Sequence, residues 1–266
     1  VILYGDVDST LAAALVASRK GVPIAHVESG LRSFDNTLPE EINRKVVDVL
    51  SSLHFVTERS ALKNLENEGL SSTSYYVGNS MIDSLVSVMH SDLYESSQYE
   101  NFGNILLTCH RPSNVDSDHA LTKILDMCKA LKKEVIWPVH PRTLHKMKEY
   151  NLLQSFENLE NLQLIEPLDY CNFLKMMATS TAVITDSGGI QEETTFLNVP
   201  CLTIRENTER PVTITEGSNT LTSFENVASY IELIYNNKYK NSEIPHLWDG
   251  KASVRMANII LKFVQS

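Results

Sequence analysis

The stretch Thr185-Asp186-Ser187-Gly188-Gly189-Ile190-Gln191-Glu192-Glu193 decides how this chain is organised. The β-branched run Ala182-Val183-Ile184 leads into it, which predicts a buried parallel strand. Two glycines follow, and then residues that can start a helix. A strand, a glycine turn and a helix N-terminus form an anion site, because free N–H groups point outward and a phosphate can approach where no Cβ intervenes.

Glu192 and Glu193 follow one turn into this helix, about where the hydroxyl groups of a ribose would lie beside a bound nucleotide diphosphate. A glycine turn that merely joins a strand to a helix is an equally good interpretation of the spacing, because one glycine pair is a weak signal.

Short apolar runs and helical patterns alternate along the whole chain, which is typical of doubly wound parallel sheets. The polar residues 91–103 have no period and interrupt the pattern, so we place a domain linker there. We therefore expect an α/β fold of two Rossmann-like domains, residues 1–95 and 96–251, with a ligand in the cleft between them. The last helix, about 252–266, can pack back on the first domain. A nucleotide should bind at the carboxyl ends of the strands of the second domain.

We expect strands at 1–6, 23–28, 54–57, 74–77, 105–109, 135–139, 162–165, 182–185 and 201–204. We expect helices at 11–20, 40–50, 60–68, 81–89, 121–132, 143–150, 170–178, 190–197, 224–235 and 252–264. Asp8-Ser9-Thr10 can cap the first helix, and Ile42, Val46, Val49 and Leu50 are spaced as the apolar face of the second.

The composition excludes some partners. The 266 residues carry a net charge of −10, which argues against a nucleic-acid or anionic-membrane binder, although a nucleotide needs only a local positive site. No apolar run is long enough to cross a bilayer. The four cysteines are far apart and form no metal-binding pair, so we expect buried thiols, a reducing compartment and a cytoplasmic location.

Asp6 and Glu28 each end a predicted parallel strand, and Glu40 begins the helix after the second strand. Because parallel strands end at one edge of a sheet, the three carboxylates should converge, and their repulsion should raise at least one pKa toward neutrality. The structural alternatives are a turn cap for Asp6, an ion pair of Glu28 with Arg32, and a helix-dipole contact for Glu40.

His110 follows a strand and could hold a phosphate or move a proton, or it could simply bond the backbone of its loop. Cys109 points to the opposite face and does not pair with it. His140, Arg142 and His145 form a small basic cluster without the further ligands that a metal needs, so a solvated loop is the favoured interpretation.

Further motifs surround the glycine turn in a fixed order: Gly5-Asp6, His26-Val27-Glu28-Ser29-Gly30-Leu31-Arg32, Pro39-Glu40-Glu41-Ile42-Asn43-Arg44, Thr108-Cys109-His110-Arg111, Glu166-Pro167-Leu168-Asp169-Tyr170 and Arg205-Glu206-Asn207-Thr208-Glu209-Arg210-Pro211. Together they resemble the non-hydrolysing UDP-N-acetylglucosamine 2-epimerases, from residue 1 to the C-terminus. One departure is Val212, where the family usually has an acidic residue.

The resemblance implies a glycosyltransferase-B-like fold with UDP on the second domain, no cofactor, no metal and a homodimer. It implies catalytic roles for Asp6, Glu28, Glu40 and His110. It implies contacts with UDP or the sugar for Arg44, His140, Pro167, Phe173, Ser187, Gly188, Gly189, Gln191, Glu193 and Arg210. The family eliminates UDP across C1 and C2 and adds it back. Which carboxylate is base and which is acid stays open.

Three other functions stay open besides the epimerase: a relative that hydrolyses the intermediate, a glycosyltransferase, and a nucleotide-sugar-binding protein without activity. The chain starts inside a predicted strand at Val1, and members of the family carry further βα units before this point, with a loop that supplies positive side chains. We therefore expect that two or three such units of the first domain are missing.

Overall fold

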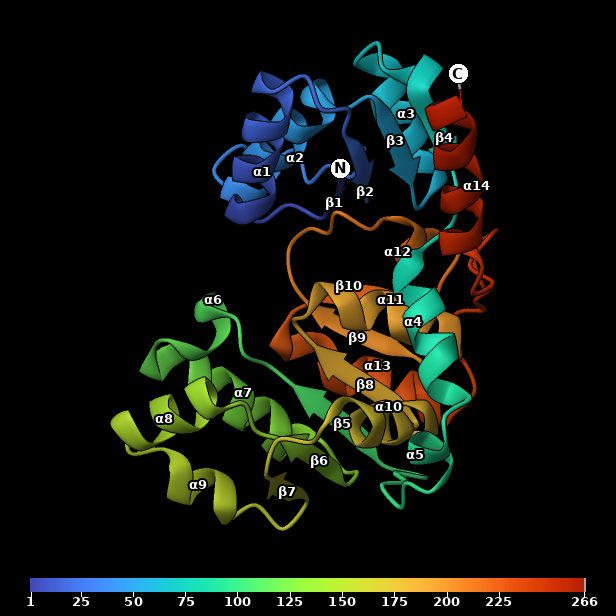
Figure 1. Cartoon of the computed structure of the whole chain (residues 1–266). Coiled ribbons are helices and arrows are strands. Elements are labelled where there is room, and N and C mark those ends of the chain that lie inside the picture. The colour runs from blue at the N-terminus through green and yellow to red at the C-terminus, as the bar shows by residue number, and fades with distance from the viewer. Residues whose placement is uncertain (266) are drawn as a thin grey trace. The chain divides into compact units, whose positions relative to one another are not determined.

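The computed structural model describes residues 1–265, and its strands form two sheets in which all pairing is parallel (Figure 1). The first sheet has the order β1-β2-β3-β4, with β1 Ile2–Tyr4, β2 Ala25–Val27, β3 Leu53–Val56 and β4 Ser74–Tyr76. The second has the order β10-β9-β8-β5-β6-β7, with β5 Ile105–Thr108, β6 Val135–Pro138, β7 Leu162–Ile165, β8 Ala182–Thr185, β9 Cys201–Ile204 and β10 Asn219–Thr222.

The chain divides into two compact units. Unit 1 consists of Val1–Val86, Thr208–Val212 and the residues from Pro245 onward, and unit 2 consists of Ser87–Asn207 and Thr213–Ile244. Unit 1 contains the first sheet and unit 2 the second, which confirms the predicted α/β class with two Rossmann-like parallel sheets.

Helices connect the successive strands within each sheet, as parallel pairing requires, and the last two α-helices follow the last strand. Those of unit 1 are α1 Asp8–Arg19, α2 Pro39–Leu50, α3 Arg59–Asn67, the 3₁₀ turn η1 Ser71–Thr73 and α14 Ala252–Gln265. Those of unit 2 are α5 Asp92–Glu95, α6 Pro112–Val115, α7 Asp118–Ala130, α8 Pro141–Glu149, α9 Leu153–Glu157, α10 Tyr170–Thr179, α11 Gly188–Leu197, η2 Phe224–Asn226 and α13 Val227–Tyr235. Two helices cross the division, α4 Ser80–Met89 and α12 Val212–Thr215.

The sequence missed one strand, β10, and the short helices α5, α6, α9 and α12. β10 reads Asn-Thr-Leu-Thr, and only tertiary pairing with β9 makes it a strand. The predicted cap Asp8-Ser9-Thr10 is wrong, because α1 already begins at Asp8 and Thr10 donates its hydroxyl to Tyr4 O at 2.9 Å.

Each unit has its own apolar core. In unit 2 the rings of Trp137 and Phe156 meet edge to face at 5.7 Å, in a core to which helices α7 and α13 also contribute. In unit 1 the C-terminal helix α14 packs Met256, Ile259 and Ile260 against the residues of β2 and β3 (Figure 1).

Helix α2 buries mostly polar residues, contrary to its apolar spacing. Ile42 is 49% exposed and Val49 is 69% exposed, so that part of the prediction is wrong. The buried residues are instead Glu41, Asn43, Arg44, Val47 and Asp48. Such burial is tolerated only where hydrogen bonds satisfy the polar groups. The turn after β2 supplies them for Glu41 and Asp48, and the residues after β1 supply them for Asn43 and Arg44.

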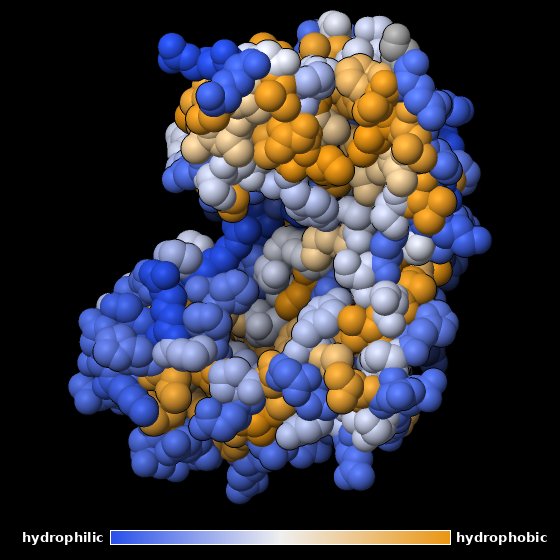
Figure 2. Space-filling model, in the orientation of Figure 1, coloured by the Kyte–Doolittle hydropathy of each residue, from blue (hydrophilic) through white to orange (hydrophobic). Residues whose placement is uncertain are grey.

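The surface of unit 1 has an apolar area near the start of β1 and along α14, visible in Figure 2. Val1, Ile2 and Val264 are exposed there, beside a groove of about 180 Å³ that Pro23, Ile260 and Phe263 also line. No helix within residues 1–265 has both the length and the apolar character that a membrane crossing requires.

Gly78 is predicted to be essential for joining residues 245–251 to the first sheet. Its φ is +84°, and a Cβ there would lie 2.1 Å from Leu247 O, whereas Gly69 has a φ of +78° and open space around it. Gly78→Ala should lower the free energy of unfolding by about 3 kcal/mol or more, and Gly69→Ala by only about 1 kcal/mol. Urea denaturation of both variants measures the difference, and equal losses would contradict the close approach.

Candidate active site

Asp6 and Glu28 follow the ends of the neighbouring strands β1 and β2. Tyr4 pairs with Val27, and Gly5 N donates to Val27 O at 3.2 Å, so the two strands end together. A Cβ on Gly5 would lie 3.9 Å from Glu28 Oε2, which shows that this carboxylate lies over the end of β1. The parallel sheet therefore brings these two predicted site residues to one edge.

Arg44 links Asp6 to helix α2. Its guanidinium forms an ion pair with the half-buried carboxylate of Asp6, and its Nη1 lies 3.3 Å from Glu41 Oε2. Glu40 is exposed in the first turn of α2, four residues before Arg44, and residues at that spacing share one side of a helix. Arg44 thus connects Asp6 to α2, and Glu40 lies one turn earlier on the same helix.

Glu41, rather than Glu40, is the buried carboxylate in the first turn of this helix. It accepts hydrogen bonds from Ser33 N at 2.8 Å, Ser33 Oγ at 3.0 Å and Phe34 N at 3.2 Å. Burial raises the pKa of Glu41, but the bonds from Ser33 and Phe34 outweigh it and hold the pKa below its usual value. This carboxylate holds the loop after β2, a role that the sequence did not reveal.

Glu28 is almost fully buried and faces a cation. Arg210 Nη2 lies 3.9 Å from Glu28 Oε2, and Arg210 also pairs with Glu209. Arg32 was a possible partner for Glu28, but it is bound instead by Asp48, at 2.7 Å, and by Glu68, at 2.6 Å. The structural alternative for Glu28 is therefore wrong, and its nearest cation belongs to the predicted substrate loop.

In unit 2 the glycine turn between β8 and α11 has the predicted form. Ser187 is the residue before the helix, and its side chain makes no capping hydrogen bond. The helix begins at Gly188, so the N–H groups of its first turn have no partner within the helix. The Gln191 side chain links this turn to β10. Its Nε2 donates to Ser187 O at 3.2 Å, and its Oε1 accepts from Asn219 Nδ2 at 3.0 Å.

His110 is held beside this turn by Asp186. The fully buried Asp186 carboxylate accepts His110 N at 3.0 Å, Arg111 N at 2.9 Å and Asn114 Nδ2 at 3.0 Å, which fixes the loop after β5. The His110 ring lies 5.5 Å from that of His140, whose Nδ1 accepts from Arg142 N at 3.1 Å. The structure thus brings His110 and His140 together.

Glu193 lies on α11 against α10. The Tyr170 hydroxyl donates to Glu193 Oε1 at 2.7 Å. Burial raises the pKa of Glu193, and the Tyr170 hydrogen bond only partly offsets this effect. Phe173, one turn further along α10, is half-buried, and Pro167 is exposed in the loop before α10.

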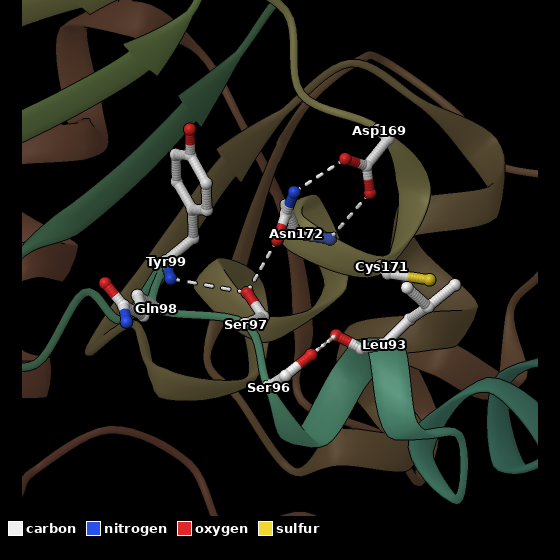
Figure 3. Close-up of a pocket in the computed structure, with 8 residues that line it drawn as sticks. All are labelled: Leu93, Ser96, Ser97, Gln98, Tyr99, Asp169, Cys171 and Asn172. Carbon is white, nitrogen blue, oxygen red and sulfur yellow. Dashed lines mark hydrogen bonds between the residues drawn. The ribbon is translucent and has the colours of Figure 1, made fainter.

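A separate cavity of about 450 Å³ lies between the residues before β5 and the start of α10 (Figure 3). Its polar side chains bond one another: Ser97 Oγ donates to Asn172 Oδ1 at 2.7 Å, and Asp169 accepts from Asn172 N and Nδ2. None of the predicted site residues lines this cavity. Among residues 1–265, no group of three acidic, histidine or cysteine side chains is arranged to hold a metal ion.

These features define an α/β protein of two Rossmann-like sheets, with carboxylates at the strand ends of one sheet and a glycine turn before a helix N-terminus on the other. Similarity to known proteins identifies the family. The family model described as UDP-N-acetylglucosamine 2-epimerase matches residues 1–261. The UDP-N-acetylglucosamine 2-epimerase of Methanococcus maripaludis is 36% identical over 277 residues, covering 98% of this chain and 74% of the relative.

A UDP-2,3-diacetamido-2,3-dideoxy-D-glucuronate 2-epimerase of Pseudomonas aeruginosa is 39% identical over 227 residues, covering 83% of this chain and 62% of that protein. Among solved structures, the Methanocaldococcus jannaschii UDP-GlcNAc 2-epimerase in complex with UDP-GlcNAc and UDP is similar with a TM-score of 0.86 and 35% identity, covering 98% of this chain and 75% of that one. The chain belongs to the UDP-N-acetylglucosamine 2-epimerase family.

Tyr170→Phe should raise the pKa of Glu193 further, because the buried carboxylate loses the hydroxyl that stabilises its charged form. The matched control is Tyr150→Phe, which removes a hydroxyl that donates to a backbone carbonyl, Asp116 O, at 2.8 Å. A carbon-13 NMR titration of the Glu193 carboxyl group measures the effect. An unchanged titration in Tyr170→Phe would show that the hydroxyl does not stabilise this carboxylate.

Proposed function

We propose that the protein is a UDP-N-acetylglucosamine 2-epimerase, an isomerase that interconverts UDP-N-acetylglucosamine and UDP-N-acetylmannosamine. The family match over residues 1–261 carries this proposal. The placement of the motif residues supports it, since Asp6, Glu28 and Arg210 gather in unit 1 while His110 and the glycine turn gather in unit 2.

The reaction needs proton transfer at C2 and a stabilised leaving group at C1. One carboxylate removes the C2 proton while the C1–O bond breaks, so UDP departs on the opposite face and leaves a 2-acetamidoglucal. UDP then adds back to C1, and a proton reaches C2 from the other face. Asp6, Glu28 and Glu40 are the proposed proton-transfer groups. Neither the elimination nor the re-addition transfers a hydride, so the proposed mechanism uses no nicotinamide.

The residues of unit 2 suit the diphosphate. The N–H groups at the start of α11 and the uncapped Ser187 hydroxyl can donate to phosphate oxygens, and His110 and His140 are proposed to support them. Glu193, held by Tyr170, can accept from the ribose hydroxyls. Pro167, Phe173, Gly188, Gly189 and Gln191 complete the proposed nucleotide site, and Arg44 and Arg210 are proposed to contact the sugar or its diphosphate.

A different sugar substrate or a different reaction is also considered. The Pseudomonas relative acts on a UDP-diacetamidoglucuronate, so a differently substituted UDP-sugar is a second candidate substrate. A chain that hydrolyses the glucal would release free N-acetylmannosamine, and an inactive one would only bind UDP. We further propose a homodimer, a cytoplasmic location and a role in cell-surface polysaccharide biosynthesis, on the basis of the family resemblance; light scattering tests the dimer.

Incubation with UDP-N-acetylglucosamine in D₂O, followed by NMR, tests the proposal. We expect deuterium at C2 together with UDP-N-acetylmannosamine, because re-addition delivers a solvent proton. Free N-acetylmannosamine with UDP would select the hydrolysing reaction. Broadened ligand signals without deuterium exchange at C2 would show that the protein binds the nucleotide sugar but does not epimerise it. The diacetamidoglucuronate substrate, tested in parallel, decides the sugar.

Glu28→Gln should abolish deuterium incorporation at C2, a loss of at least about 100-fold, while UDP affinity stays within a few-fold. Glu209→Gln is the control, because Glu209 also pairs with Arg210 but does not follow the end of a strand. Exchange kinetics and calorimetric titration with UDP measure the two effects. Equal losses of exchange in both variants would assign the effect to Arg210 rather than to a proton transfer by Glu28.

A further inference from the structure

Glu28 has a strained backbone. Its φ is +68°, in the left-handed region that costs a residue with a side chain about 1–2 kcal/mol. Such a strained conformation persists only where surrounding contacts hold it in place, and it occurs most often at functional sites. The side-chain position of Glu28 therefore depends on whatever holds the turn that follows it.

Asp48, in the second half of α2, holds that turn. Its fully buried carboxylate accepts the Ser29 hydroxyl on Oδ1 and Gly30 N, at 3.1 Å, on Oδ2. Only glycine fits at this position of the turn, since a Cβ on Gly30 would meet Ala61 O at 2.5 Å. The carboxylate thus closes the turn directly behind Glu28.

The same carboxylate reaches the end of the neighbouring strand through His26. His26 Nδ1 lies 2.6 Å from Asp48 Oδ1, and Nε2 lies 3.0 Å from the carbonyl of Gly5, the residue before Asp6. The His26 ring therefore connects the Asp48 carboxylate to the main chain beside Asp6. Burial raises the pKa of Asp48, but the hydrogen bond and charge of His26, followed by the charge of Arg32, outweigh it and lower the pKa to about 2.

We propose that Asp48 is a positioning residue of the epimerase: its carboxylate holds the two strand-end turns that present Asp6 and Glu28. This rests on the proposed function of those two carboxylates. Asp48 itself is fully buried and acts only through the turn and through His26. A loosened turn would misplace Glu28, and a displacement of about 1 Å in a catalytic group can cost about 100-fold in rate.

The chain offers a matched control in Glu68. Arg32 binds Asp48 at 2.7 Å and Glu68 at 2.6 Å, so Asp48→Asn and Glu68→Gln each remove one negative charge from the same guanidinium. Only Asp48 also bonds the turn and His26. A role confined to pairing with Arg32 would make the two variants alike.

Amide hydrogen exchange and steady-state kinetics on the two variants test the proposal. Asp48→Asn should remove the exchange protection of the Gly30 amide and lower kcat about 100-fold, with KM within a few-fold. Glu68→Gln should keep both near the wild-type values. Unchanged protection in Asp48→Asn, or lost protection with unchanged kcat, would overturn the proposal.

If Asp48→Asn does not fold, Ser29→Ala is tested in its place. The Ser29→Ala variant keeps the Asp48 carboxylate and removes one of its hydrogen bonds to the turn. Faster Gly30 exchange and a several-fold fall in kcat are expected, and wild-type values of both would overturn the proposal. A wild-type protein that does not epimerise refutes the proposed function instead. Hydrogen exchange in the resting protein then still decides whether Asp48 holds the turn.

Discussion

Parallel strand pairing is the constraint on which both halves of the candidate site depend. Every strand of a parallel sheet ends at the same edge, so residues from distant motifs arrive together. In unit 1 the pairing of Tyr4 with Val27 places Asp6 and Glu28 side by side. In unit 2 the pairing of Thr108 with Thr185 brings His110 within reach of Asp186. The register of two strand pairs thus positions most of the groups that the proposed chemistry uses.

Buried carboxylates turn these strand ends into defined loops. Asp186 and Asp48 are both fully buried, and each accepts main-chain N–H groups from the turn beside a proposed site residue. Burial of a charge is costly unless donors surround it, and both carboxylates have such donors. These hydrogen bonds stabilise one conformation of each loop, because each connects the loop to a neighbouring helix or strand.

The sequence predicted the alternation of strands and helices, the glycine turn and the candidate residues, because those signals are local or carried by motifs. It failed for α2, where Ile42 and Val49 are exposed while Glu41 and Asp48 are buried. Hydrophobic periodicity assumes that the apolar side of a helix faces the core. Here the turn after β2 presents backbone and hydroxyl donors, so the polar side of α2 is the one that fits.

The sequence by itself determined the α/β class and the strand-turn-helix at Gly188. These follow from β-branched runs, glycine positions and residue order within short windows. Only the tertiary structure decided that Arg32 pairs with Asp48 rather than Glu28, and that Asp186 fixes the loop of His110. The physical reason is that these hydrogen bonds join residues 16 and 76 positions apart, and only strand pairing and helix packing bring such partners together.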